Sequence, residues 1–250
     1  MAFNEKNATF AENYFLKDMS CILHLETSTN VCSVAASLDG ACIYHEEDFK
    51  GPSHAVELGV FVDHALSFID NHAIPLDAVA VSCGPGSYTG LRIGSSMAKG
   101  ICYGRGVKLI ALPTLEVMCV PILLFEDLPE DALLCPMLDA RRMEVYSCIY
   151  DRALKAVRPT QADIIEKGIY NEYLKQHPVY FFGNGMDKCR DVLQHPNAHF
   201  IERIAPMAKW MFPLAEKASA RGEFQDVAYF EPYYLKNFVA AKPKDLLHVK

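Results

Sequence analysis

After residue 18, apolar and polar positions alternate in short runs bounded by turn-forming residues. A period of two residues predicts β-strands, and the runs cover residues 21–26, 31–38 and 41–49. The turns between them, including Asp39-Gly40, are too short for crossover connections. The three strands are therefore expected to be antiparallel.

The apolar spacing then changes to the period of an α-helix between residues 53 and 71. Its main apolar face is broad, and Val56 and Val60 add apolar surface elsewhere on the helix. A continuously apolar strand at 78–82, a helix at 91–103 and a strand at 108–112 follow. Strands connected through helices run parallel, so this half predicts a mixed sheet covered by helices.

The second half of the chain repeats this order of elements. Strands are predicted at 133–138, 144–150, 153–158, 179–182 and 199–204, and helices at 161–176, 186–194 and 207–221. An acid follows the first strand of each half, at Glu26 and Asp139, and a G-x-G turn follows a later strand, at 84–86 and 183–185. These matches predict an α/β protein with two related lobes. The predicted divisions are an N-terminal extension at 1–18, lobes at 19–115 and 116–228, and a tail at 229–250.

Composition narrows the classes of function. The chain has 250 residues, of which 51% are hydrophobic and 22% charged, and its formal net charge is −7. These values are typical of a globular protein, and no overall positive field attracts it to nucleic acid. The nine cysteines form no C-x-x-C pair and lie mostly in apolar runs, which favours reduced thiols and a cytoplasmic location. No membrane span and no secretory signal are expected.

The stretch SCGPGSYTGLRIG, residues 82–94, places glycines between a strand and a helix. Such a turn can direct backbone N–H groups at an anion, with Gly84, Gly86 and Ser87 as candidate nucleotide or phosphate contacts. The spacing matches neither the dinucleotide-binding fingerprint nor the P-loop. A turn that only shapes the surface and a generic anion site both remain open.

The helix that follows this turn carries Ser96, Gly100 and Gly104 at intervals of four residues. A glycine inside a helix costs roughly 1 kcal/mol relative to alanine. Close approach of another backbone would compensate for that cost, and packing against the helix's own sheet is the alternative. Together with the broad apolar surface of 53–71, the pattern predicts a pair of helices presented to another chain.

Catalytic and metal-binding patterns are weak. His195 and His199 are the only histidines four residues apart, but Pro196 separates them and no third ligand is evident. No G-x-S-x-G elbow is present. Glu26 lacks a following glycine that would let the backbone close over a phosphate. We therefore expect no catalytic residue and no metal ligand.

Seven segments, in order from Met19 nearly to the end of the chain, resemble one known family. They are ILHLETSTNVCSVA, SHAVELGVFVDHAL, AVSCGPGSYTGLRIGSSMAKGICYG, LPTLEVM, LDARRMEVYSCIYD, FFGNGM and EPYYLKNFVA. The family is TsaB (YeaZ), which is related to the catalytic protein TsaD. The resemblance implies an actin/sugar-kinase/Hsp70-like fold with two RNase H-like lobes. Glu26 departs from the aspartate common in the family, which weakens the case for phosphate binding.

The resemblance also implies a function in making N6-threonylcarbamoyladenosine at position 37 of tRNAs that read ANN codons. Where TsaD has the metal-binding H-M-E-G-H, this chain reads Thr114-Leu115-Glu116-Val117-Met118. A hydroxyl and a thioether are poor replacements for two imidazoles. A noncatalytic scaffold subunit is therefore expected. The alternatives on the same fold are a stand-alone ATP-dependent small-molecule kinase and a metallopeptidase.

The partners implied by the resemblance are a TsaD-like paralogue, a TsaE-like ATPase and a second copy of the chain, with tRNA contacted through the complex. No tightly bound cofactor is expected, and ATP or ADP is expected at the interface of the complex. The interface is expected on the helices at 53–71 and 91–103. Its candidate residues are His54, Val56, Leu58, Val60, Phe61, His64, Arg92, Ser95, Ser96, Ala98 and Lys99.

Overall fold

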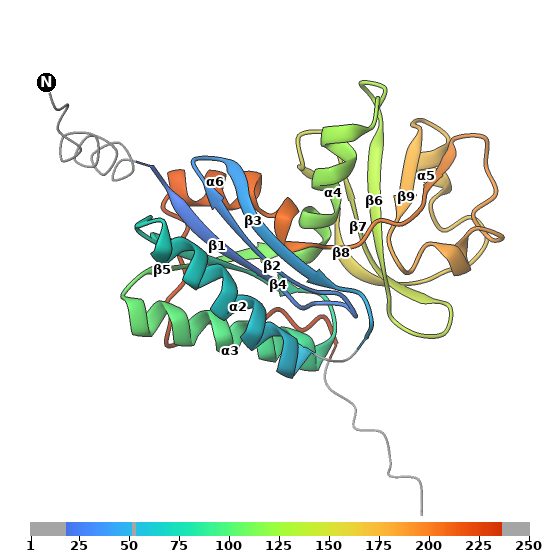
Figure 1. Ribbon diagram of the computed structural model, residues 1–250. Helices are drawn as coiled ribbons and strands as arrows, with labels where there is room; N and C mark the ends of the chain where they lie inside the picture. The colour runs from blue at the N-terminus through green and yellow to red at the C-terminus, as the bar shows by residue number, and fades with distance from the viewer. Residues whose placement is uncertain (1–18, 52–53, 237–250) are drawn as a thin grey trace, which may run out of the picture.

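The computed structural model describes residues 19–51 and 54–236 and divides into two lobes, each built on a five-stranded mixed sheet (Figure 1). The first sheet has the order β3-β2-β1-β4-β5. Its strands are β1 (Cys21–Glu26), β2 (Cys32–Leu38), β3 (Ala41–Asp48), β4 (Ala78–Gly84) and β5 (Lys108–Pro113). β1, β2 and β3 are antiparallel neighbours, whereas β4 is parallel to β1 and to β5.

The second sheet repeats this topology with the order β10-β9-β6-β7-β8. Its strands are β6 (Leu133–Asp139), β7 (Glu144–Tyr150), β8 (Ala156–Ile164), β9 (Val179–Phe182) and β10 (Ala198–Ile201). β6, β7 and β8 pair antiparallel, and β9 is parallel to β6 and to β10. The predicted pair of related lobes with mixed sheets is confirmed.

The helices cover both faces of the first sheet. α2 (His54–Asn71) and α3 (Tyr88–Arg105) lie on one face, and α6 (Phe212–Ala220) lies on the other (Figure 1). Successive β1 side chains point to opposite faces: Leu23 packs in the core beneath α2 and α3, and Ile22 packs in the core beside α6. This arrangement leaves the outer surfaces of α2 and α3 on one side of the protein.

α4 (Thr114–Phe125) lies between the two lobes, and the sequence analysis assigns it no element. Val117 and Val120 pack in the core of the first sheet, whereas Leu115 and Met118 pack in a core of the second. A helix that is apolar all round has no amphipathic period, so the pattern of apolar positions does not reveal it. The division expected at 115/116 falls inside this helix.

Three predicted helices differ from the structure. Most of 161–176 is the end of β8 and a loop, and only α5 (Asn171–Leu174) is helical. Within 186–194 only a 3-10 turn, η1 (Asp187–Cys189), forms. The helix expected at 207–221 is present as η2 (Ala208–Trp210) and α6, and both pack on the first sheet although the analysis places them in the second lobe. The extension at 1–18 lies outside the described residues.

The extension of β8 is stabilised by contacts that are distant in sequence. Asp163 is buried, and its carboxylate accepts hydrogen bonds from the Ser147 hydroxyl (2.5 Å) and the Tyr170 hydroxyl (2.8 Å). Arg158 donates to the same carboxylate through both terminal nitrogens. An extended strand brings these groups together, and this network outweighs the local helical pattern.

His24 on β1 is almost fully buried, and its Nε2 lies 2.8 Å from the Ser37 hydroxyl. Burial lowers the pKa of this imidazole from its ordinary 6.5 to about 3. The folded protein therefore excludes a proton that the unfolded chain binds below pH 6.5. Through this group, stability falls as the pH drops below 6.5 and is independent of pH above that value.

We expect wild type to lose about 2 kcal/mol of unfolding free energy through His24 between pH 7 and pH 5. Burial raises the pKa of Glu26, so the stability that Glu26 contributes is present at low pH and is lost as the pH rises. Urea titrations measure the stability of wild type and of His24→Asn at both pH values. Both proteins carry Glu26, so its opposing effect cancels in the difference between them. Equal losses in the two proteins would contradict the prediction.

Candidate functional site

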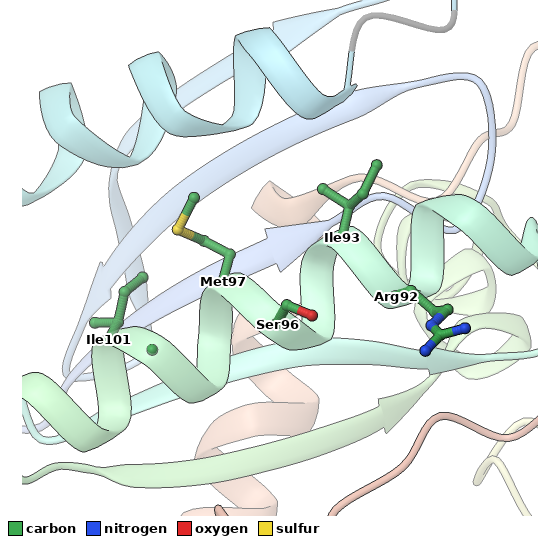
Figure 2. A pocket seen from close by; sticks show the side chains of 6 residues that line it. Arg92, Ile93, Ser96, Met97 and Ile101 are labelled. Carbon is green, nitrogen blue, oxygen red and sulfur yellow. The ribbon is translucent and has the colours of Figure 1, made fainter.

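The outer face of the α2–α3 pair carries an apolar groove of about 630 Å³ (Figure 2). Its lining comes from α3 alone and consists of Arg92, Ile93, Ser96, Met97, Gly100 and Ile101. Ile93, Met97 and Ile101 repeat every four residues and lie on the side of α3 that faces α2, as Figure 2 shows. The sequence analysis does not select these three residues, although their spacing carries the signal.

The neighbouring helix α2 carries two exposed valines of its own. Val56 is 69% exposed and Val60 is 44% exposed. Their position four residues apart places them on the same side of the helix. Exposed apolar side chains on two neighbouring helices are typical of a surface that another protein covers.

The glycines of α3 divide into two groups with different surroundings. A Cβ added at Gly90 would lie 3.2 Å from the Thr27 carbonyl carbon and closer still to its oxygen, and one at Gly94 would collide with the Thr27 side chain. At Gly100 and Gly104, no atom of the described residues beyond the helix's own nearby backbone lies within 4 Å of the same position. The first two glycines are therefore explained by packing within the lobe, and the last two are not.

Most of the predicted interface residues on α2 reach the surface. His64 is exposed, and its Nδ1 lies 3.1 Å from Glu46 Oε1 on β3. Phe61 is half-buried against the core. Leu58 is fully buried, which corrects its assignment to the interface, because its side chain is enclosed beneath the helix. His54 begins α2, and its side chain lies outside the described residues.

On α3, Arg92 and Ser96 are exposed as expected. Ser95 and Ala98 are buried against the sheet, so their side chains cannot contact a partner in this conformation. Lys99 is half-buried, and its Nζ donates to the carbonyl oxygens of Ala228 (3.0 Å) and Phe230 (3.1 Å). This lysine holds the C-terminal segment 226–236, which we call the strap, beside α3.

The glycine-rich turn is packed within the protein. The Ser87 N–H donates to the Ser28 carbonyl at 2.7 Å, and the Ser87 hydroxyl accepts from the Gly90 N–H at the start of α3. A Cβ at Gly84 would lie 2.5 Å from the Tyr233 carbonyl oxygen, and Gly86 is equally crowded by Ser28. These contacts favour a turn that docks α3 onto the lobe over an open phosphate cradle. Nucleotide contact by the three candidate residues stays a prediction.

Glu26 at the end of β1 is fully buried. Its Oε1 accepts from the Ser28 N–H at 2.6 Å, and its Oε2 accepts from the Ser82 hydroxyl on β4. Burial raises the pKa of this carboxyl group, whereas the hydrogen bonds from Ser28 and Ser82 lower it. Glu26 therefore ties the loop after β1 to the neighbouring strand and is not open to a substrate.

The segment Thr114–Met118, which the family resemblance aligns with the metal-binding H-M-E-G-H of TsaD, forms the first turn and a half of α4. Thr114 and Met118 are both buried, and Met118 contacts Gly183. Among residues 19–51 and 54–236, no group of three or more His, Cys, Asp or Glu side chains is arranged to hold a metal ion. A buried hydroxyl and a buried thioether are poor replacements for imidazole ligands of a metal ion.

Known proteins match most of the length of this chain. A family model described as "TsaD: tRNA N6-adenosine threonylcarbamoyltransferase" matches residues 50–243. The TsaB protein of Escherichia coli is 29% identical over 228 residues, which cover 88% of this chain and 96% of that protein. The chain belongs to the TsaB (YeaZ) family. TsaB of Bacillus subtilis is also 29% identical, over 69% of this chain and 75% of its own length.

Solved structures agree with the TsaB fold. A Pseudomonas aeruginosa protein described as similar to the peptidase YEAZ superposes with a TM-score of 0.75 and 24% identity, covering 87% of this chain and all of that one. The names of the Escherichia coli and Bacillus subtilis relatives place the TsaB family in the biosynthesis of tRNA threonylcarbamoyladenosine. In the part of the chain that the structure describes, every helix is too short or too polar to cross a membrane.

Proposed function

We propose that this protein is a noncatalytic subunit that supports threonylcarbamoyl transfer to adenosine 37 of ANN-decoding tRNAs by pairing with a TsaD-like paralogue. The α2–α3 face is the proposed pairing surface. A TsaE-like ATPase, with ATP or ADP at the assembled interface, completes the proposed complex. A second copy of the chain occupies the same face when the paralogue is absent.

The observation that carries this proposal is the open space at Gly100 and Gly104 beside an apolar groove. Glycine inside a helix costs about 1 kcal/mol relative to alanine, and no packing contact within 4 Å among the described residues compensates for it. A closely approaching helix of another chain would compensate for that cost. The exposed valines of α2 extend the same surface.

The residues around α4 support a noncatalytic role. Thr114 and Met118 stand where the catalytic relatives have metal-binding histidines, and both are enclosed in lobe packing. A stand-alone kinase would turn over ATP without partners, and a metallopeptidase would retain a metal after chelation. Metal analysis, an ATPase assay on the isolated chain and a tRNA modification assay with each subunit omitted separate the three functions.

Val60→Arg is expected to weaken association with the paralogue at least tenfold, because it places a charge in a buried apolar contact. The matched control is Val157→Arg on β8, since Val157 is 47% exposed and lies in the other lobe. Titration calorimetry of both variants against the paralogue measures the effect. Both should melt at the wild-type temperature. Equal binding by the two variants would show that α2 is not the pairing surface.

A further inference from the structure

Cationic side chains of both lobes and of the strap lie along one chain of contacts, and one of them, Arg92, also lines the α2–α3 groove. We call this region the basic corner and define it by Arg92, Arg141, Arg142, Lys188 and Lys236. A chain of contacts connects its two sides. The Arg92 guanidinium donates to the Tyr88 hydroxyl at 2.8 Å, and the Tyr88 ring lies 4.8 Å from the Tyr234 ring on the strap.

The strap then reaches the second lobe. Lys236 donates through its Nζ to Glu144 Oε2 at the start of β7, and the Glu144 N–H donates to the Arg141 carbonyl at 3.2 Å. Lys188 donates to the Asp139 carboxylate and to the Glu144 carbonyl oxygen. The corner therefore joins the start of α3, the end of the strap and the turn between β6 and β7.

The β6–β7 turn presents two arginines at an energetic cost. Arg141 and Arg142 have φ angles of 70° and 52°, in the left-handed region where glycine and asparagine are favoured. Each such residue costs on the order of 1 kcal/mol. Both side chains are exposed, and within the described residues neither guanidinium group forms a hydrogen bond or ion pair. The turn alone gives no reason for arginine at either position.

The charge at this corner has the opposite sign to that of the whole protein. The formal net charge of the chain is −7, yet the carboxylates of Asp139 and Glu144 are each paired with a lysine. Arg141 and Arg142 are left as unpaired positive charge beside these neutral pairs. Two further carboxylates lie near this corner, Asp187 beside Lys188 and Glu231 on the strap, against the three arginines Arg92, Arg141 and Arg142. The local field therefore favours an anion.

Aromatic rings accompany these cations. The Tyr88 and Tyr234 rings pack against each other with a tilt of 41°, and Tyr233, next to Tyr234 on the strap, is 48% exposed. An exposed tyrosine near arginines suits an RNA strand, because bases stack on aromatic rings while guanidinium groups contact phosphates.

We propose that the basic corner binds the phosphate backbone of the RNA substrate, with Arg141 and Arg142 as the principal contacts. This inference rests on the proposed function, since it assigns a tRNA-binding surface to this subunit. The strap contributes Lys236 and the exposed Tyr233 ring, and it reaches the corner from the first lobe.

The test uses a fluorescein-labelled transcript of an ANN-decoding tRNA and fluorescence anisotropy, with the full chain assembled with its paralogue and with the full chain alone. Arg141→Gln/Arg142→Gln is expected to lower RNA affinity at least fivefold. It should also reduce the slope of log affinity against log salt concentration by about 0.7–0.9 for each lost phosphate contact. Arg152→Gln/Arg221→Gln removes the same charge from exposed positions at the far end of β7 and after α6.

The control variant should bind RNA like wild type. Equal RNA affinity and equal salt slope for the two double variants would overturn the inference. It would also be overturned if Arg141→Gln/Arg142→Gln kept its RNA affinity but lost association with a protein partner. Association with the paralogue is measured separately by size-exclusion chromatography. Failure to associate counts against the proposed function, whereas the anisotropy of the chain alone still tests the corner.

Discussion

Gly90→Ala is expected to lower the free energy of unfolding by about 3 kcal/mol, although alanine normally stabilises a helix relative to glycine. The added methyl group would lie 3.2 Å from the Thr27 carbonyl carbon and nearer to its oxygen. The start of α3 would have to move away from the loop after β1, and the hydrogen bond from the Thr27 hydroxyl to the Gly90 carbonyl (2.8 Å) would be lost. Urea denaturation followed by circular dichroism measures the change.

Gly100→Ala is the matched control on the same helix. Nothing lies within 4 Å of the added methyl group, so this variant should be as stable as wild type or up to about 1 kcal/mol more stable. Gly90→Ala that unfolds at the wild-type urea concentration would show that Thr27 and α3 are not in contact. A destabilised Gly100→Ala would show that the outer face of α3 is covered within the monomer.

Asp163→Ala is expected to destabilise the protein by 3–5 kcal/mol, about the cost of leaving one member of a buried ion pair alone. The substitution leaves the Arg158 guanidinium without its carboxylate and removes the acceptor for the Ser147 and Tyr170 hydroxyls. Burial raises the pKa of Tyr170, so the ring cannot supply a compensating negative charge. Thermal and urea unfolding of the full chain measure the loss.

Asp70→Ala removes an aspartate that is also paired with an arginine, but at the surface. Arg105 donates to both Asp70 oxygens, at 2.8 and 2.7 Å, and the pair is largely open to solvent. Exposed pairs contribute about 0–1 kcal/mol, so this variant should remain close to wild type. If the two aspartate variants lose similar stability, the network around Asp163 does not stabilise β8.

The sequence predicts the strands well where the signal is local. Residues 144–150 and 179–182 match β7 and β9 in full, because short apolar runs between turn residues specify a strand by themselves. The segment 161–176 is predicted wrongly because β8 depends on Arg158 and Asp163 meeting Ser147 and Tyr170. Such a network is visible only after the chain has folded.

The candidate site is predicted in outline but not residue by residue. The spacing of small and apolar residues identifies α2 and α3 as the exposed pair, yet it does not say which side of each helix meets the sheet. Leu58 and Ala98 are therefore assigned to a surface from which they are absent. The sequence analysis leaves Gly90 in the turn before the helix, and only the position of Thr27 shows that Gly90 is enclosed whereas Gly100 is open.

The burial of α4 against both sheets has a consequence for how the protein denatures. Its side chains complete one core through Val117 and Val120 and another through Leu115 and Met118. A fragment that ends just before or just after this helix would expose apolar surface to water. Neither lobe is therefore expected to be soluble when expressed separately. Heat should melt both halves in one cooperative transition, with a single calorimetric peak.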